Sequence, residues 1–268
     1  MVQVNPASTN AVRAKTGAGV TDCAAALKAT GGDIDAAVEW LRAKGLFRGP
    51  AKERAPLKEG VVVTRVEGSS KVAMIELMTQ TEFVAEDPKF MELAELLADT
   101  ALRVGGDVAT LLRSDCVPGK PVEDLMVQMG AAFGQRIGLR RAASLSVGQG
   151  GVGSYDRHLG RGGVVVAVEC EKGGRALQTL SGLLPINLWN AYVLESSGKT
   201  QPAAAASDGV AGGRVRELLA ERVYLDSPSI GNANVSIRQM IEQAAKEIGA
   251  PITSIRFALF DITDPDGP

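Results

Sequence analysis

Aromatic residues are scarce in this sequence, at 4% of its 268 positions. A chain with so few aromatic rings offers few surfaces on which nucleic acid bases can stack. Its formal net charge of −2 also lacks the basic excess that usually drives nucleic acid binding. We therefore expect no direct contact with nucleic acid. Hydrophobic residues still make up 45% of the chain, which is enough for a sizeable aliphatic core.

Cysteine and long apolar runs are scarce as well. The three cysteines, Cys23, Cys116 and Cys170, lie far apart and form no Cys-x-x-Cys pair. This spacing argues against a structural zinc site, and the odd number fits a reducing compartment better than a disulfide scaffold. No apolar run approaches the roughly 18 residues that a membrane-spanning helix needs. We expect neither a metal site nor membrane contact.

Histidine chemistry depends on a single residue, His158, because the sequence has no other histidine. Ser154 and Asp156 lie near it in sequence, but triad members usually come from different elements of a fold. The sequence also lacks the Gly-x-Ser-x-Gly turn that presents a catalytic serine in many hydrolases. We interpret His158 as a structural or surface residue.

The segment 1–46 is predicted to form a three-helix module. Glycines divide it into short helical stretches: about 8–15, 21–27 and 34–44. Thr21 and Asp33 are the expected N-caps of the second and third helices, since their side-chain oxygens can accept N–H groups of the first turn. Each helix is too short to be stable alone, so we expect the three to pack together.

The rest of the chain follows a linker at 47–59 and alternates between predicted strands and helices. The strands share β-branched residues bounded by turn residues: 61–67, 71–78, 139–147, 163–170 and 252–262. The helices share apolar residues at spacings of three and four: 90–104, 122–137, 174–184, 214–222 and 237–248. Ser236 and Gln239 form the capping box that opens the last helix.

This order predicts an α+β fold, in which the three-helix module precedes a core of two antiparallel-sheet-plus-helix subdomains at 60–138 and 139–268. Residues 195–213 contain few large apolar groups, so we predict a flexible insertion there. A polar loop is predicted at 80–87, between the first hairpin and the helix that follows it.

The glycine-rich stretch 148–153 matches Gly-x-Gly-x-x-Gly, a pattern of dinucleotide-binding folds. In those folds the glycines open a helix whose N-terminus receives the pyrophosphate. Here they lead toward the strand at 163–170. We therefore interpret them as a flexible connection between strands, and a dinucleotide-dependent enzyme is an alternative that rests on this stretch alone.

Phe83 is the unusual member of the loop at 80–87. Glu82, Glu86 and Asp87 make this loop acidic, and acidic residues before a helix suit the positive end of its dipole. A large aromatic side chain in such surroundings needs burial. Two alternatives follow: Phe83 packs against its own core, or it packs against a partner protein.

Two stretches resemble the signatures of the elongation factor Ts family. Residues 16–23 are similar to the signature of its N-terminal module, and residues 80–85 to a second signature whose usual order is Thr-Asp-Phe-Val. Weaker similarities follow in order: the Arg-Arg pair within 137–143, Gly153-Ser154-Tyr155 before His158, and Ile255-Arg256-Phe257 in the last strand. The resemblance covers nearly the whole chain.

The resemblance implies a function without catalysis. Members of this family bind the GTPase elongation factor Tu in its GDP form and speed the release of GDP. GDP or GTP and magnesium are bound by that partner, so we expect no cofactor in this chain.

Roles for individual residues are also implied by the resemblance. Arg13, Gly19 and Val20 would belong to a docking surface for the GTPase domain. Phe83 would wedge between helices of the GTPase, and Glu82, in place of the usual aspartate, would help to disturb the region that holds magnesium. The expected partner-binding set also includes the other residues of the second signature: Gln80, Thr81 and Val84.

The stretch 195–213 departs from the family pattern. Bacterial members often carry a long helical hairpin for dimerisation before the last strand-rich segment, and this stretch cannot form one. We therefore predict a 1:1 heterodimer with elongation factor Tu rather than a homodimer. The short insertion looks like that of organellar members, which favours the mitochondrial matrix, with a bacterial cytoplasm as the alternative.

A function of a different class is the alternative. The three-helix module, with Trp40 and Leu41 in its third helix, also looks like a ubiquitin-associated domain. Such domains bind ubiquitin through an apolar loop between helices one and two, usually with an aromatic residue. The corresponding stretch 17–20 has none. The alternative function is thus a ubiquitin-associated-type protein-binding module.

Overall fold

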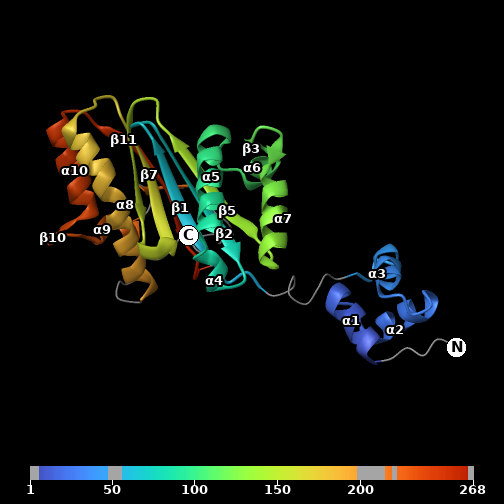
Figure 1. Ribbon diagram of the computed structural model, residues 1–268. Helices are drawn as coiled ribbons and strands as arrows, with labels where there is room; N and C mark the ends of the chain where they lie inside the picture. The colour runs from blue at the N-terminus through green and yellow to red at the C-terminus, as the bar shows by residue number, and fades with distance from the viewer. Residues whose placement is uncertain (1–5, 48–55, 198–214, 219–221, 265–268) are drawn as a thin grey trace. The chain divides into compact units, whose positions relative to one another are not determined.

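The computed structural model describes residues 6–47, 56–197, 215–218 and 222–264. Contacts divide the chain into two units, residues 1–56 with 131–136, and residues 57–130 with 137–268. The first contains three helices and the second contains two sheets covered by helices (Figure 1). This combination confirms the predicted α+β class.

The first unit contains the predicted helices: α1 Pro6–Thr16, α2 Val20–Ala29 and α3 Ile34–Ala43. They enclose a small apolar core: Val12, Ala18, Cys23, Ala26, Leu27, Ala37 and Leu41. Asp33 caps α3 as predicted, because its carboxylate accepts the N–H groups of Asp35 and Ala36 at 2.9 Å each. The prediction for Thr21 is wrong: Gly19 occupies the N-cap position of α2, which places Thr21 inside the first turn.

Two larger antiparallel sheets form the core of the second unit. The first has the order β1-β2-β5: β1 Glu59–Glu67, β2 Lys71–Thr79 and β5 Gly138–Ser146. The second has the order β6-β7-β11-β8: β6 Gly150–Asp156, β7 Gly162–Cys170, β11 Ile252–Asp261 and β8 Arg216–Glu217. Met74 and Leu145 of the first sheet share one buried cluster with Val165 and Phe260 of the second. The two sheets therefore pack as a sandwich.

Helices cover the outer faces of this sandwich (Figure 1). The first sheet carries α5 Pro88–Val104, which contacts β1 and β2. The second carries α8 Arg175–Ser196 and α10 Ile237–Ile248. The shorter elements are α4 Glu82–Ala85, α6 Val108–Arg113, α7 Val122–Phe133, η1 His158–Gly160, α9 Arg222–Asp226, and the strand pairs β3 Asp115–Val117 with β4 Lys120–Pro121 and β9 Pro228–Ser229 with β10 Asn232–Ser236.

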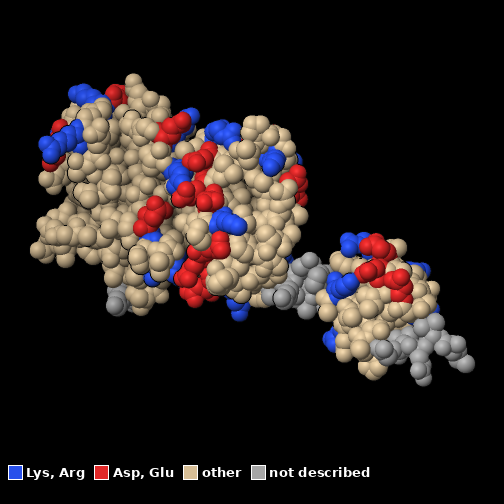
Figure 2. All heavy atoms as spheres, in the orientation of Figure 1, with Lys and Arg blue, Asp and Glu red and all other residues tan. Residues whose placement is uncertain are grey.

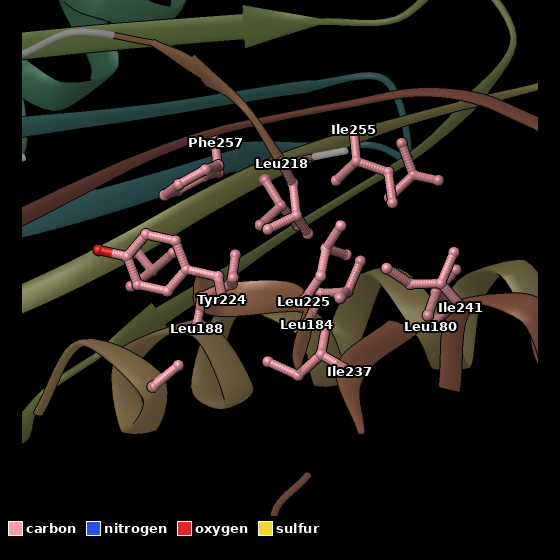
Figure 3. Packing of buried hydrophobic residues seen from close by; sticks show 14 of the residues in the cluster. Leu180, Leu184, Leu188, Leu218, Tyr224, Leu225, Ile237, Ile241, Ile255 and Phe257 are labelled. Carbon is pink, nitrogen blue, oxygen red and sulfur yellow. The ribbon is translucent and has the colours of Figure 1, made fainter. Parts of the chain in front are cut away.

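The core under α8 and α10 is mostly aliphatic, as the composition predicts (Figure 3). Leu184 and Leu188 of α8 meet Ile237 of α10 there, and Phe257 of β11 completes the cluster with the ring of Tyr224. The predicted capping box of α10 is present, since Ser236 accepts the N–H of Gln239 and the Gln239 side chain accepts the N–H of Ser236.

Several predicted boundaries are wrong. The loop at 80–87 contains the one-turn helix α4. The helix expected to reach residue 137 ends at Phe133, because Gly134 adopts a φ of 62°. The strand at 139–147 was assigned to the C-terminal subdomain, but β5 pairs with β2 and completes the first sheet. The helix expected at 214–222 is replaced by β8, which pairs with β11, and by α9.

Two further predictions fail at the contact between β6 and α8. The stretch 148–153 leads into strand β6 rather than forming a flexible connection, because its glycines let the strand pack closely on α8. The helix expected at 174–184 continues through Pro185 to Ser196, since the residues beyond the proline are also buried. Most of the predicted insertion at 195–213 lies outside the described residues, which stop at 197 and resume at 215.

Candidate partner-binding site

The second signature forms a tight turn between two long elements. β2 ends at Thr79 and α5 begins at Pro88, with α4 between them. The N–H groups of Val84 and Ala85 both donate to the carbonyl of Thr81 at 3.2 Å, which closes the single turn of α4. Asp87 then caps α5 by accepting the N–H of Lys89 at 2.8 Å. These hydrogen bonds define the backbone of the turn that carries the second signature.

Phe83 points away from the core of its own unit. Its exposed fraction is 80%, the highest among the exposed large hydrophobic residues of the described chain, and it is the sole aromatic among them. Val84 and Ala85, which follow it, are 1% and 7% exposed and hold the turn against the sandwich. Phe83 therefore does not pack against the core of its own unit.

The surroundings of Phe83 are acidic. Gln80 is partly exposed, while Thr81, Glu82 and Glu86 are exposed. Further acidic residues continue along α5: Glu92, Glu95 and Asp99. Figure 2 shows these acidic side chains gathered over α4 and α5. Arg65 on β1 pairs with Glu95 and Asp99 at 3.1 Å each, which neutralises part of the acidic charge along α5. At the N-terminal end of α5, acidic residues at 82, 86 and 87 outnumber the single cation Lys89.

The groups that suggested catalysis do not come together. Asp156 accepts a hydrogen bond from the Thr64 hydroxyl at 2.8 Å, and His158 lies exposed in η1. Within the described residues no three side chains of the His, Cys, Asp and Glu types form a group that could hold a metal ion. Across the same residues, no helix is both long and apolar enough to cross a membrane.

Comparison with known proteins identifies the family. Residues 80–181 match the family model described as elongation factor TS. The chain is 33% identical over 272 residues to elongation factor Ts of Brucella ovis, and the match covers 92% of this chain and 88% of the relative. Elongation factor Ts of Brucella abortus gives the same values. That of Zymomonas mobilis is 29% identical over 98% of this chain and 93% of the relative.

The chain belongs to the elongation factor Ts family. Its first signature, residues 16–23, runs from the last residue of α1 through the turn at 17–19 into the start of α2. The Thr16 hydroxyl donates to the carbonyl of Val12 at 2.7 Å and accepts the N–H of Ala18 at 3.3 Å. Gly17 takes a φ of 61°, which disfavours other residues. These contacts give Thr16 and Gly17 of the signature a structural role in the turn.

The predicted docking residues of the first unit lie on and beside that turn. Arg13 is exposed on α1, and Val20 is 53% exposed at the start of α2. Gly19 is the N-cap between them. The three belong to the first unit, whereas residues 80–84 belong to the second. Within the second set Val84 is buried, so it contributes only by anchoring the turn.

One arrangement was missed by sequence reasoning. Glu76 on β2 is fully buried and lies between two consecutive arginines of β5, Arg140 and Arg141. The sequence singled out the arginine pair only as part of a family resemblance. Its carboxylate partner lies 65 positions from Arg141, and no local pattern connects the two.

Proposed function

We propose that this chain is a guanine-nucleotide exchange factor that binds elongation factor Tu in its GDP form and promotes GDP release. Membership of the elongation factor Ts family supports this function. The exposure of Phe83, on a turn that the buried Val84 and Ala85 anchor, is the main observation that supports residues 80–84 as the partner-binding site.

Exchange by such a turn needs no bond to be made or broken. GTPases hold GDP through backbone amides around its phosphates and through magnesium. An aromatic ring inserted between helices of the partner displaces these groups, and Glu82 beside Phe83 brings a negative charge toward the magnesium region. Because nucleotide and factor stabilise different states of the partner, each weakens the binding of the other.

The first unit supplies a second contact in this proposal. Arg13, Gly19 and Val20 dock on the GTPase domain, and residues 80–84 then act on the nucleotide site. One copy of this chain binds one copy of elongation factor Tu, and the partner alone binds the nucleotide and magnesium. The relatives compared above come from bacteria, which favours a bacterial cytoplasm over the mitochondrial matrix as the compartment.

Release of a fluorescent GDP analogue from elongation factor Tu tests the proposal. The wild-type chain should accelerate release, and Phe83→Ala should reduce the acceleration by about tenfold or more, as expected for a central aromatic anchor. Val66→Ala is the matched control. Val66 is 46% exposed but lies at the opposite end of the β1–β2 hairpin, since Glu59 pairs with Thr79 and Glu67 with Lys71.

Equal losses in the two variants would mean that Phe83 is not the anchor. No acceleration by the wild-type chain with any elongation factor Tu would refute the exchange function itself. Titration with ubiquitin tests the alternative function, a ubiquitin-associated-type protein-binding module. Micromolar binding of ubiquitin by the three-helix module would support that alternative.

A further inference from the structure

Glu76, Arg140 and Arg141 form a buried ionic cluster, here called the arginine clamp. One carboxylate oxygen of Glu76 accepts from Nε of Arg141 at 2.6 Å, and the other accepts from Nη1 of Arg140 at 3.1 Å. The side chains of Glu76 and Arg141 are 0% and 2% exposed, and that of Arg140 is 22% exposed. A single carboxylate is therefore held by two arginines that are adjacent in sequence.

A bulge in β5 makes this arrangement possible. Successive side chains of a regular strand point to opposite faces, so neighbouring arginines would not reach the same carboxylate. Glu76 lies opposite Arg141, but Leu77 lies opposite Leu139, which leaves Arg140 as an extra residue in β5. An extra residue of this kind bends the strand and redirects its side chains.

The clamp ties together the ends of several strands. Arg140 also donates to the carbonyls of Ile262 at 3.3 Å and Leu57 at 3.4 Å. Arg141 donates to the carbonyls of Asp261 at 3.0 Å and Asp264 at 3.3 Å. Leu57 precedes β1, Asp261 is the last residue of β11, and Ile262 and Asp264 follow that strand. The two sheets are thereby joined at one end by charge-assisted hydrogen bonds.

This end of the sandwich is the one that carries Phe83. Leu57 is followed by Lys58, whose N–H donates to the carbonyl of Thr79 at 3.1 Å. Thr79 is the last residue of β2, and the candidate turn starts directly after it. A short path thus runs from Arg140 through the backbone of residues 57–58 to the base of the turn.

Stability alone does not account for the clamp. Two charges taken out of water lose their hydration, and replacing a buried ion pair by apolar residues is often neutral or stabilising. Within the described part of the protein, Nη1 of Arg141 is also a buried donor without a hydrogen-bond partner. Directed bonds between strand ends, in contrast, fix geometry in a way that apolar packing does not.

We propose that the arginine clamp is a positioning element that holds residues 80–84 in the geometry required for nucleotide exchange. The inference rests on the proposed function of the turn. Its immediate physical consequence, an ordered turn at the end of β2, is a property of the free protein and is measurable without a partner.

Arg140→Met tests the clamp in the full-length chain. This change leaves the Glu76–Arg141 pair in place and removes the bonds to Leu57 and Ile262. Amide hydrogen exchange of Val84 and Ala85 should become about fivefold faster, whereas amides of α10 should keep their rates. Arg256→Met is the control, since Arg256 is a strand arginine that bonds Glu169 and the carbonyl of Ser146 elsewhere in the same unit. It should leave Val84 and Ala85 unchanged.

A double-mutant cycle then asks whether the clamp acts through Phe83. Arg140→Met should lower the rate of GDP release about fivefold in the presence of Phe83, and less than twofold in a Phe83→Leu background that retains measurable exchange. Unchanged amide rates in the turn, or equal losses of release in both backgrounds, would overturn the proposal. If the wild-type chain accelerated no release, the exchange function would fail, and the amide rates would still decide the positioning role.

Discussion

Gly153 on β6 lies directly against the backbone carbonyl of Ser181 on α8. A Cβ atom built at residue 153 would come within 1.9 Å of that oxygen. Ser181 precedes Pro185 by four residues, and proline has no N–H to donate to it. β6 therefore approaches α8 at the Ser181 carbonyl, which lacks the helical hydrogen bond that an N–H at position 185 would donate.

Substitution of Gly153 should be strongly destabilising. Gly153→Ala forces the strand and α8 apart, and overpacking of this kind costs about 3 kcal/mol in the free energy of unfolding. Denaturant titration of the full chain measures the loss. Gly148→Ala is the control from the same glycine-rich stretch, because no atom lies within 4 Å of its added Cβ. Equal stabilities of the two variants would contradict the close contact.

The same contact shows why part of the fold was not predictable from the sequence. Runs of β-branched residues between turn residues predicted the hairpin, β7 and β11, and apolar residues at spacings of three and four predicted α5. The Gly-x-Gly pattern and Pro185 are both local signals for an end of regular structure. In the structure neither signal ends its element: β6 continues through the glycines, and α8 continues through Pro185. The glycines of β6 leave room for the proline-containing helix. Such a pairing between distant segments has no local trace.

The candidate site was predictable to a different extent. An aromatic residue in an acidic loop marked Phe83 as unusual from the sequence alone. Its exposure depends on Val84 and Ala85 taking the buried positions of a one-turn helix, and four residues are too few to show a helical period. The arginine clamp depends on a bulge and on a carboxylate in another strand, so neither its geometry nor its burial was accessible.

The N-cap of α3 should matter for the stability of the first unit. Asp33→Ala removes the acceptor for the N–H groups of Asp35 and Ala36, and loss of such a cap costs about 1 kcal/mol. Amide exchange of α3 in the full-length chain measures the effect. Asp35→Ala, which removes the exposed pair with Lys15, should cost less than about 0.5 kcal/mol. A larger loss for Asp35→Ala than for Asp33→Ala would reverse this assignment.

Asp107 gives the stability of α6 a dependence on pH. Hydrogen bonds from the Thr110 side chain and backbone lower the pKa of this carboxyl below its ordinary value of 3.8. Between the lowered pKa and 3.8 the unfolded chain binds more protons than the folded chain. The stabilisation is therefore complete above pH 3.8 and is lost as the pH falls through the folded pKa.

Asp107→Asn removes this contribution, because asparagine caps a helix without titrating. We expect the melting temperature of the wild type to fall relative to that of the variant as the pH is lowered from 5 to below the folded pKa. Thermal unfolding across this range measures the difference. A constant difference between the two proteins would show that Asp107 titrates equally in the folded and unfolded chains.

Leu159 is the sole non-glycine residue with a positive φ in the described part of the chain, at 62°. The left-handed conformation costs about 1–2 kcal/mol for a residue with a Cβ atom. The Leu159 side chain is 67% exposed, so packing does not offset this strain fully. Leu159→Gly should increase the free energy of unfolding by about 0.5–1 kcal/mol, the relief being reduced by the greater freedom of glycine in the unfolded chain.

Gly160→Ala is the opposing control in the same turn. Gly160 also has a positive φ, at 64°, and an added Cβ would approach Val61 and the carbonyl of Val62 at 3.3 Å. Denaturant titration should place this variant below the wild type and Leu159→Gly above it. A loss of stability in Leu159→Gly would mean that the exposed leucine makes contacts that outweigh its backbone strain. Those contacts would then explain why a leucine, rather than a glycine, occupies this strained position.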